Sequence, residues 1–466
     1  MIKSKFKSPN TYFILSSILV LMALLTWIIP ASEYETMIIG EREVVDPNTF
    51  HYVDRQPQSI GPLFMAPIRG FVDAAEIIGF VLIVGGIFGI FQRTKAIDSG
   101  ILALAKAHKV SKLVQMLTIP IFMLLFSLGG AVFGMSEETI PFILIFVPLA
   151  WTLGYDSVTG VAIPFLGAGA GFAGAFLNPF TVGVAQGIAD VPLFSGISYR
   201  FVCWVVVTTV AIVYVMRYAS KVQADPEKSP MFKLDQEKKK SLDSEQLENF
   251  AGMAGRDKWV LLTFAAGMIM LVVGVLRFGW YIEEIAALFL FTGIAVGVVG
   301  RLSIGDITDS FLKGAKDLVG TALIIALARA ILVIAKDGYV IATILHALSS
   351  AIESFHPIMS SQLMFGVQTL LNFFVPSGSG QAALTMPIMA PLADLVGVTR
   401  QTAVLAFQFG DGFSNMIIPT SAVAMGVLTL AGIPWEKWAR WIIPLELIYL
   451  LVGCLLLIPP YLMHWI

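Results

Sequence analysis

The sequence predicts an all-α polytopic membrane protein made of two related halves, and three observations support this fold class. Its 466 residues are 57% hydrophobic and only 13% charged, whereas a typical soluble domain has about 25% charged residues. Apolar runs long enough to cross a bilayer recur along the chain. Two further apolar segments are interrupted by small residues at corresponding places in the two halves, a pattern that indicates internal repeats in membrane transporters.

The interrupted segments are the most informative part of the sequence. They are GGAVFGMSEETIPFILIFVP at Gly129–Pro148 and NFFVPSGSGQAALTMPIMAP at Asn372–Pro391. A spacing of 243 positions relates four residue pairs, namely Ser136 and Ser379, Pro148 and Pro391, Leu149 and Leu392, and Gly154 and Gly397. Gly, Ser and Pro do not continue a helix, and inside a bilayer the freed backbone groups must face protein or water. We therefore expect two re-entrant helical hairpins, 113–153 and 358–396, whose tips form a binding site.

The remaining apolar runs predict the membrane spans. A helix needs about 18 to 20 apolar residues to cross roughly 30 Å of hydrocarbon. The segments that meet this need are 11–31, 76–93, 157–188, 197–218, 257–276, 281–300, 318–335, 399–430 and 438–461. They predict about nine transmembrane helices besides the two hairpins. The run in 11–31 is too long for the apolar region of a cleaved signal peptide, so we expect it to be the first membrane helix.

These segments divide the chain into six parts. The parts are the first transmembrane helix in 1–31, an extracytoplasmic loop at 32–75, a first repeat at 76–218 with a broken helix at 157–188, a cytoplasmic linker at 219–257, scaffold helices at 258–317, and a second repeat at 318–461 with a broken helix at 399–430. The linker is polar and poor in aromatic residues, which predicts a partly disordered connector. The segments 94–112 and 336–357 are amphipathic, which predicts helices along the membrane surface.

The distribution of basic residues predicts the orientation, because they concentrate in cytoplasmic loops. Basic residues are frequent in the N-terminal segment with Lys3, Lys5 and Lys7, in the segment 94–112 and in the linker, so we place these parts in the cytoplasm. The span 281–300 has no counterpart in the first half. This additional crossing gives the second repeat the opposite orientation in the membrane. We therefore predict two inverted copies, a cytoplasmic N-terminus, an extracytoplasmic C-terminus and hairpins that open to opposite sides.

Each hairpin is followed by a long span that is broken near its centre. The breaks are GAGAGFAGAFLNPF at Gly167–Phe180 and QFGDGFSNMIIPTSA at Gln408–Ala422. Unwound backbone and Ser, Thr and Asn side chains at such breaks can coordinate cations, and half-helix N-termini can face anionic groups. Other polar residues in apolar runs, Gln186, Asn372 and Gln408, are expected to make interhelical hydrogen bonds.

Three carboxylates fall in this region: Glu137 and Glu138 at the first tip, and Asp411 in the second break. An ionisable residue at membrane depth indicates function by default. A structural alternative exists, in which Ser136 caps a half-helix and both glutamates lie in its first turn, favoured by the helix dipole. Arg329 is the nearest basic residue to this region. Besides a role in the site, it has a structural alternative, in which it pairs with an acidic residue or snorkels towards the membrane surface.

Composition also excludes several kinds of partner. A net charge of −2 argues against a polyanionic partner, so we expect no nucleic-acid binding. Cys203 and Cys454 lie in apolar runs and form no disulfide or metal pattern. The Gly-rich strings follow no strand and lack a phosphate-binding lysine, so we expect no bound cofactor.

Three strings of the sequence resemble a known family. The strings GGAVFGMSEETIPF, NPFTVGVAQGIADVP and SGSGQAALTMPIMAPLADLVGVTRQTAVLAFQFGDGFSN are similar to the YfcC family of bacterial inner-membrane carriers. That family is related to anaerobic C4-dicarboxylate carriers and arginine/ornithine exchangers in the ion transporter superfamily. The resemblance implies an elevator-type secondary carrier, usually a homodimer, in the bacterial cytoplasmic membrane, with a scaffold and a transport domain that holds both hairpins and both broken spans.

Transferred by position, the resemblance also implies a set of site residues. Substrate-binding residues are expected at Ser136, Glu137, Glu138, Asn178, Ser377, Gly378, Ser379, Gly380, Gln381, Asp411, Asn415 and Thr420. A coupling ion, Na⁺ or H⁺, is expected at Glu138, Asn178, Asp411 and Asn415.

We predict a carrier rather than an enzyme, which binds its small-molecule substrate and a coupling ion between the tips and the broken spans. The first tip is acidic and neither tip has an Arg or Lys, which favours an amino acid, preferably basic, moved by exchange. A C4-dicarboxylate or other carboxylate is the alternative.

Two alternatives come from other functional classes. An intramembrane aspartyl protease needs two aspartates that share a proton, and Tyr155–Asp156 with Phe409–Asp411 faintly resembles such a pair. However, Gln408 replaces the first glycine of the motif, and the predicted topology places Asp156 at the cytoplasmic surface. A channel is the other alternative, and it would show no counterflow.

Overall fold

The chain forms a helical body in the computed structural model, which describes residues 11–39, 42–239, 252–352, 355–463 and 465. The expected all-helical class is confirmed, with one addition near the N-terminus. The first part contains α1 (Thr11–Ile28), β1 (Ser32–Glu33), β2 (Thr36–Ile39), β3 (Arg42–Val45), η1 (Pro47–Thr49), β4 (His51–Tyr52), α2 (Ile60–Asp73), α3 (Ala75–Arg93), α4 (Ala96–Val110), α5 (Lys112–Phe133), η2 (Glu137–Phe142), α6 (Ile143–Thr152), α7 (Ser157–Ala173), η3 (Pro179–Gly183), α8 (Val184–Ile188) and α9 (Ile197–Ala224).

The second part contains helices and no strand among its described residues. It contains η4 (Pro226–Lys228), α10 (Phe232–Lys239), α12 (Gly255–Phe278), α13 (Ile282–Val299), α14 (Ile304–Asp317), α15 (Val319–Asp337), α16 (Ile341–Ser350), α17 (Pro357–Phe374), α18 (Gly378–Leu395), α19 (Arg400–Ser414), α20 (Ala422–Ala431), α21 (Trp435–Leu456) and α22 (Ile458–Leu462). Among the described residues, seven helical stretches are long and apolar enough to cross a membrane. The apolar helices Tyr12–Ile28, Ser157–Ala173 and Ala422–Ala431 are shorter.

The segment 32–75, predicted as a loop, is more structured than the sequence suggested. Two antiparallel pairs, β1 with β4 and β2 with β3, form small ribbons. Helix α2 follows them and packs on α15, where a side chain at Gly70 would lie only 2.4 Å from the carbonyl oxygen of Ala326. This helix was not expected from the sequence, because Pro67 lies beyond its first turn, where proline usually breaks a helix.

The linker 219–257 is also more ordered than predicted over its first part. Helix α9 continues to Ala224, and α10 docks on the body of the molecule. Asp235 of α10 accepts hydrogen bonds from the backbone N–H of Ser157 at 2.8 Å and from its hydroxyl at 2.6 Å, while Lys238 donates to the carbonyl oxygen of Ala431 at 2.8 Å. The predicted disorder of the rest of the linker falls mostly on residues 240–251, and the N-terminal lysines fall on residues 1–10; both lie outside the described residues.

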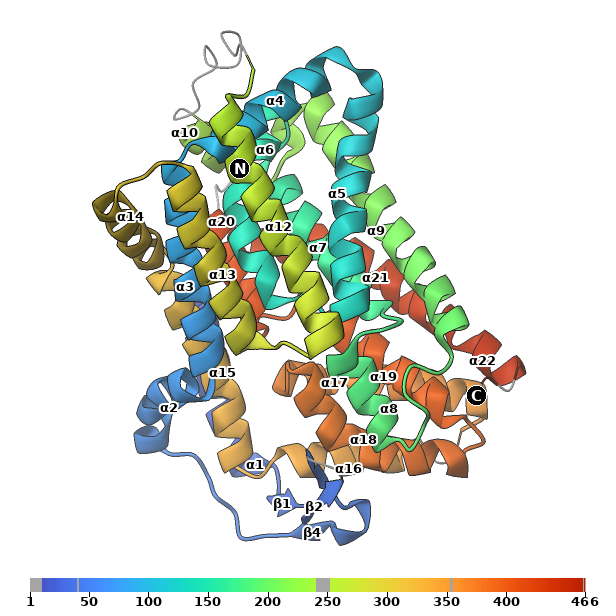
Figure 1. Ribbon diagram of the computed structural model, residues 1–466. Coiled ribbons are helices and arrows are strands. Elements are labelled where there is room, and N and C mark those ends of the chain that lie inside the picture. The colour runs from blue at the N-terminus through green and yellow to red at the C-terminus, as the bar shows by residue number, and fades with distance from the viewer. Residues whose placement is uncertain (1–10, 40–41, 240–251, 353–354, 464, 466) are drawn as a thin grey trace, which may run out of the picture.

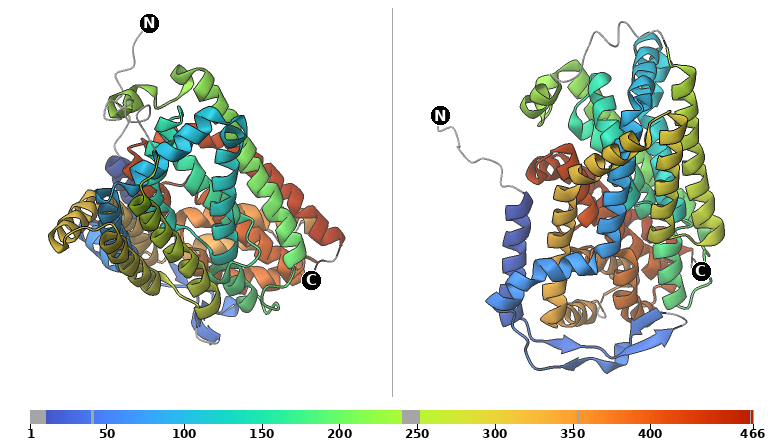
Figure 2. Two further views of the ribbon diagram at one scale, coloured as in Figure 1. Left: turned by 45° about the horizontal axis from the view of Figure 1, so that its top comes forward. Right: turned by 60° about the vertical axis from the view of Figure 1, so that its left-hand side comes forward.

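Two helical hairpins approach the middle of the molecule from opposite faces. The first consists of α5, η2 and α6, and its open end lies near α4; the second consists of α17 and α18, and its open end lies near α16. In Figure 1, α4 and α10 lie at one end of the molecule, and α16 and the strands lie at the other. The side view in Figure 2 shows the same separation. The two hairpin tips therefore meet inside the body.

Glycines allow close packing of each hairpin on the broken helix that follows it. A side chain at Gly171 of α7 would lie 1.8 Å from the carbonyl oxygen of Ser127 of α5. A side chain at Gly410 of α19 would lie 2.5 Å from Cβ of Gln368 of α17. Because neither site has space for a methyl group, these backbones are held in direct contact.

Candidate functional site

A cavity of about 150 Å³ lies where the two hairpin tips meet the two helix breaks; we call it the tip cavity. Eight of the twelve residues predicted as substrate-binding line it: Ser136, Glu137, Glu138, Ser377, Gly378, Ser379, Asn415 and Thr420. The lining also includes Phe180, Thr181, Tyr281, Arg329 and Ser421. The other four predicted residues, Asn178, Gly380, Gln381 and Asp411, do not line this cavity.

The first tip is a tight turn that presents carboxylates. Gly134 ends α5 with a left-handed φ of 74°, a conformation that favours glycine. The backbone N–H of Ser136 then donates to Oε2 of Glu138 at 3.0 Å, and the Thr139 hydroxyl donates to the carbonyl oxygen of Ser136 at 2.6 Å. The Ser136 side chain makes no capping bond. Glu138 therefore caps its own turn through Oε2, and both glutamates line the cavity.

The second tip is neutral and closely packed. Helix α18 begins directly at Gly378, and the backbone N–H of Gln381 donates to the carbonyl oxygen of Ser377 at 2.7 Å. A Cβ atom at Gly378 would lie 2.4 Å from Cγ2 of Thr181 and 3.0 Å from Oδ2 of Asp411. Glycine at this position therefore brings the tip backbone against both helix breaks.

The helix breaks are stabilised by their own polar side chains. In the first, Oδ1 of Asn178 accepts from the backbone N–H groups of Phe180 at 2.9 Å and Thr181 at 3.3 Å, which starts the π-helical turn η3. In the second, α19 ends at Ser414 and α20 starts after Ser421, whose hydroxyl accepts from the N–H of Ala424 at 3.3 Å. Asn178 thus serves as a helix cap beside the cavity.

Asp411 is fully buried directly behind the second tip. Its Oδ1 accepts from the side-chain amide of Asn415 at 2.8 Å. Its Oδ2 is buried and has no hydrogen-bond partner among the described residues, and the same holds for the hydroxyl oxygens of Thr181 and Thr420. A buried carboxylate oxygen without a donor is costly. These oxygens therefore provide acceptors for a cation, a proton or a donor group of a ligand.

Arg329 of α15 adds positive charge to the tip cavity. Its Nε lies 2.6 Å from Oδ2 of Asp73 of α2, and about a fifth of its side chain (21%) is exposed. The structural pairing considered for this arginine is present, and the same side chain lines the cavity with Glu137.

Three residues near the cavity were missing from the predicted site. The Asn-Pro pair just before Thr181 could have pointed to this threonine, because it marks the helix break, whereas no local sequence pattern pointed to Asp73 or Tyr281.

The remaining predicted residues have other partners. The side-chain amide of Gln381 donates to the carbonyl oxygen of Gln368 at 2.9 Å and to its side-chain oxygen at 2.7 Å, so Gln381 joins the two arms of its hairpin. The expected interhelical bonds are confirmed: Gln186 donates to Oε1 of Gln401 at 3.0 Å, Asn372 to the hydroxyl of Ser414 at 2.7 Å, and Gln408 to the carbonyl oxygen of Phe172 at 2.6 Å.

The arrangement gives no support to an aspartyl protease. Asp156 caps α7, where its Oδ1 accepts from the N–H of Thr159 at 2.9 Å and its Oδ2 from the hydroxyl of Ser229 at 2.6 Å. Asp411 lies beside the tips and bonds to Asn415. No hydrogen bond joins the two aspartates among the described residues, and each bonds to other groups, so the structure does not support the proton-sharing pair that the protease alternative requires.

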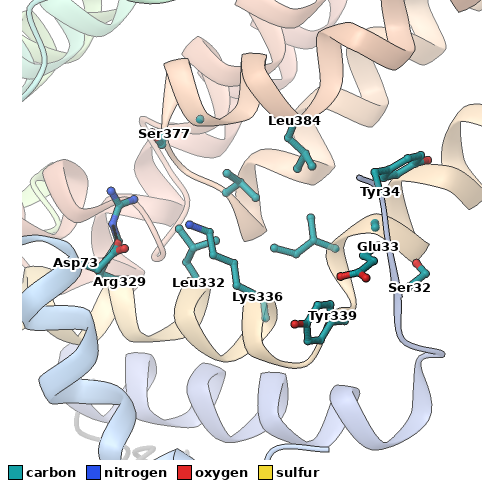
Figure 3. A pocket seen from close by; sticks show the side chains of 15 residues that line it. Ser32, Glu33, Tyr34, Asp73, Arg329, Leu332, Lys336, Tyr339, Ser377 and Leu384 are labelled. Carbon is teal, nitrogen blue, oxygen red and sulfur yellow. Dashed lines mark ion pairs between the residues drawn. The ribbon is translucent and has the colours of Figure 1, made fainter. Parts of the chain in front are cut away.

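A second cavity, of about 310 Å³, lies against the other side of the second tip; we call it the vestibule (Figure 3). Its charged lining residues are Glu33, Asp73, Arg329 and Lys336. Gly380, predicted as a substrate-binding residue, lines the vestibule rather than the tip cavity. Arg329 and Ser377 line both cavities.

Comparisons with known proteins find one matching family model and two relatives that cover most of this chain. A family model described as DcuC, C4-dicarboxylate anaerobic carrier, matches residues 8–461. A protein of Escherichia coli strain K12, named "Putative basic amino acid antiporter YfcC", is 38% identical over an alignment that covers 93% of this chain and 92% of the relative. An uncharacterized protein of Haemophilus influenzae is 29% identical over 98% of this chain and 96% of its own length.

Two solved transport proteins are also similar at low identity. The YdaH transporter of Alcanivorax borkumensis is 15% identical with a TM-score of 0.44, over 98% of this chain and 99% of that one. MtrF of Neisseria gonorrhoeae is 15% identical with a TM-score of 0.43, over 96% of this chain and 94% of that one. Both TM-scores are below 0.5, and no conclusion follows from them.

Proposed function

The chain belongs to the DcuC family of C4-dicarboxylate anaerobic carriers. We propose that it is a secondary carrier that exchanges basic amino acids across the bacterial inner membrane. Its family and its several long apolar helices make it a multi-pass membrane carrier of a small-molecule substrate. The observation that carries the proposal is the tip cavity, in which two hairpin tips and two helix breaks enclose Glu137 and approach Asp411.

The charges of the tip cavity favour a solute with both a cationic and an anionic group. Glu137, which lines the cavity, and the unpartnered oxygen of Asp411, which lies behind Gly378, suit an ammonium or guanidinium group, because charge-assisted hydrogen bonds are the strong ones. Arg329 and the first backbone N–H groups of α18 suit a carboxylate. A basic amino acid satisfies both ends, and the name of the relative from Escherichia coli agrees with this choice.

A C4-dicarboxylate is the second candidate, because one specific residue favours it. Arg329 brings a guanidinium into the tip cavity although neither tip carries a basic residue. A dicarboxylate would use Arg329 at one end and the N-terminal end of α18 at the other. The description of the matching family model agrees with this class of substrate.

For the transport mechanism, we propose an elevator movement of an inverted repeat. The order of elements from α2 to α9 corresponds to that from α14 to α21: an amphipathic helix, a span, a surface helix, a hairpin, a broken helix and a long helix. Reciprocal packing supports this correspondence, since α2 packs on α15 and α14 packs on α3. The hairpins and broken helices would move as one body against a scaffold of α1–α3 and α12–α15.

The coupling ion is proposed to be Na⁺ or H⁺ beside Asp411 and Asn415. The free oxygens of Asp411, Thr181 and Thr420 are the strongest support. Glu138 and Asn178 contribute less, because each already accepts backbone hydrogen bonds. We propose a homodimer with cytoplasmic N-termini and extracytoplasmic C-termini, which light scattering in detergent and one-sided labelling of terminal tags would test.

Counterflow in proteoliposomes tests the proposed function. Vesicles loaded with unlabelled L-arginine should accumulate labelled L-arginine or L-ornithine transiently, and vesicles loaded with succinate should not. Accumulation of succinate alone would replace the amino-acid proposal with the dicarboxylate one. Flux without any counterflow would indicate a channel and contradict a carrier.

A further inference from the structure

One basic side chain of the vestibule, that of Lys336, lies near the second hairpin tip and has no ion-pair partner among the described residues. Lys336 lines the vestibule near the C-terminal end of α15, two helical turns after Arg329. Residues seven positions apart lie on the same side of a helix, with a rise of roughly 10.5 Å between them. Figure 3 shows the side chain of Lys336 directed along α15 towards the end of the vestibule where Arg329 and Ser377 lie.

Two of the three carboxylates around Lys336, those of Asp73 and Asp337, already pair with an arginine. Asp73 pairs with Arg329, and Asp337 accepts from both terminal nitrogens of Arg69, at 3.0 Å for Nη2 to Oδ1. Oε1 of Glu33 lies 3.3 Å from Nε2 of His51. Lys336 forms no ion pair within the described part of the chain. The vestibule therefore has an ammonium group that lacks a carboxylate.

The vestibule also adjoins the proposed substrate site. Arg329 and Ser377 belong to its wall and to the wall of the tip cavity, so the two spaces adjoin at these residues. One wall comes from the second hairpin, and the opposite wall comes from α15 and the segment after α1. Glu33 lies towards the end away from Arg329 in Figure 3.

We propose that the vestibule is a second binding position for the substrate, in which Lys336 receives its carboxylate before Arg329 does. The inference rests on the proposed carrier function and names what the two candidate substrates share: a basic amino acid and a C4-dicarboxylate both carry a carboxylate. Lys336 binds this group at the vestibule, and Arg329 then accepts it at the passage beside Ser377. Glu33 is placed to receive an ammonium group at the far end, a contact that only the amino acid makes.

The first test measures occupancy of the vestibule without transport. Ala342 lines the vestibule and is half-buried, so an Ala342→Cys variant provides a small reporter whose labelling by a maleimide can be followed in detergent. The protein without this substitution corrects for the native cysteines. L-arginine should slow labelling several-fold, and so should succinate if dicarboxylates enter. Agmatine and succinamide, which lack the carboxylates, should not slow it.

Adding Lys336→Gln to the reporter should abolish the protection, and Lys336→Arg should retain it. Equal protection with and without the lysine, or none by either carboxylate, would overturn the proposal. Protection without counterflow of either solute would support the vestibule and contradict the carrier function. Protection by arginine alone, and its loss in Glu33→Gln, would identify the amino acid as the source of the carboxylate.

The second test separates a binding role from a structural one by kinetics. Lys336→Gln should raise the KM for uptake about tenfold and change kcat less than twofold, because it removes one charge-assisted contact outside the tip cavity. The wild-type KM should rise with ionic strength and the variant KM should not. Lys313→Gln removes an exposed lysine of α14 that lines neither cavity and serves as the control. An unchanged KM in Lys336→Gln would contradict the proposal.

Discussion

The two hairpins have the same layout but contribute different chemistry to the tip cavity. The first tip is a short 3₁₀ turn with two glutamates, one of which accepts a bond from the backbone of the turn. The second tip has no charged residue between Asn372 and Pro391, and its helix begins at a glycine that lies against Asp411. The first tip therefore provides charge, whereas the second provides close approach to a charge held on a broken helix.

The largest expected effect follows from removing the charge behind the second tip. Asp411→Ala should lower counterflow by about a hundredfold or more, because it takes a buried carboxylate away from its partners. Asp394→Asn is the matched control, since this exposed aspartate pairs with Arg400 at 2.8 Å away from both cavities. Equal activity of Asp411→Ala and wild-type protein in proteoliposomes would show that the second half contributes no essential charge.

A smaller effect is expected from the first tip. Glu137→Gln should weaken binding of L-arginine by about tenfold to a hundredfold, since a hydrogen bond to a charged group contributes about 1.5–3 kcal/mol. Succinate binding should stay the same or become tighter, because the change removes a negative charge. Thermal shifts with both solutes would measure this. A weaker effect on arginine than on succinate would reverse the roles assigned to the cavity charges.

The close approach of the second tip can be tested by adding one methyl group. Gly378→Ala should lower the transport rate about tenfold, because overpacking costs about 1–3 kcal/mol and the methyl group would meet Thr181 and Asp411. Gly366→Ala in the same hairpin, where no atom lies within 4 Å of the added Cβ, is the control. Similar rates for the two variants would contradict a tight contact at Gly378.

The smallest expected effect is that of removing the Glu138 carboxylate, and it distinguishes the role of Glu138 from that of Glu137. Glu138→Ala should reduce stability by about 1 kcal/mol, the usual value of a helix cap, because the backbone N–H of Ser136 loses its acceptor. Its thermal midpoint should fall by a few degrees, while arginine still shifts the midpoint as in the wild type. Loss of the arginine shift with an unchanged midpoint would assign Glu138 to substrate rather than to the turn.

Part of this architecture could be predicted from the sequence because it depends on local conformational limits. Long apolar runs predicted helices, and Gly134, Pro179 and Pro419 marked places where a helix ends or breaks. Helix α2 was missed because Pro67 suggests a loop, although packing on α15 keeps the segment helical. Tertiary packing regularly overrides such weak local preferences.

The positions of the polar residues in an apolar chain, and the places where glycine and proline interrupt the helices, follow from the sequence alone. The family resemblance supplied the expected site residues, and eight of those twelve line one cavity. The partner of each polar group, in contrast, depends on how the chain packs. Glu138 bonds to its own turn, Arg329 pairs with Asp73 from a helix more than 250 positions away, and Gly378 lies against Asp411. The physical reason is that helix breaks depend on each residue's own dihedral limits, whereas charge pairs depend on distances that only the packed chain sets.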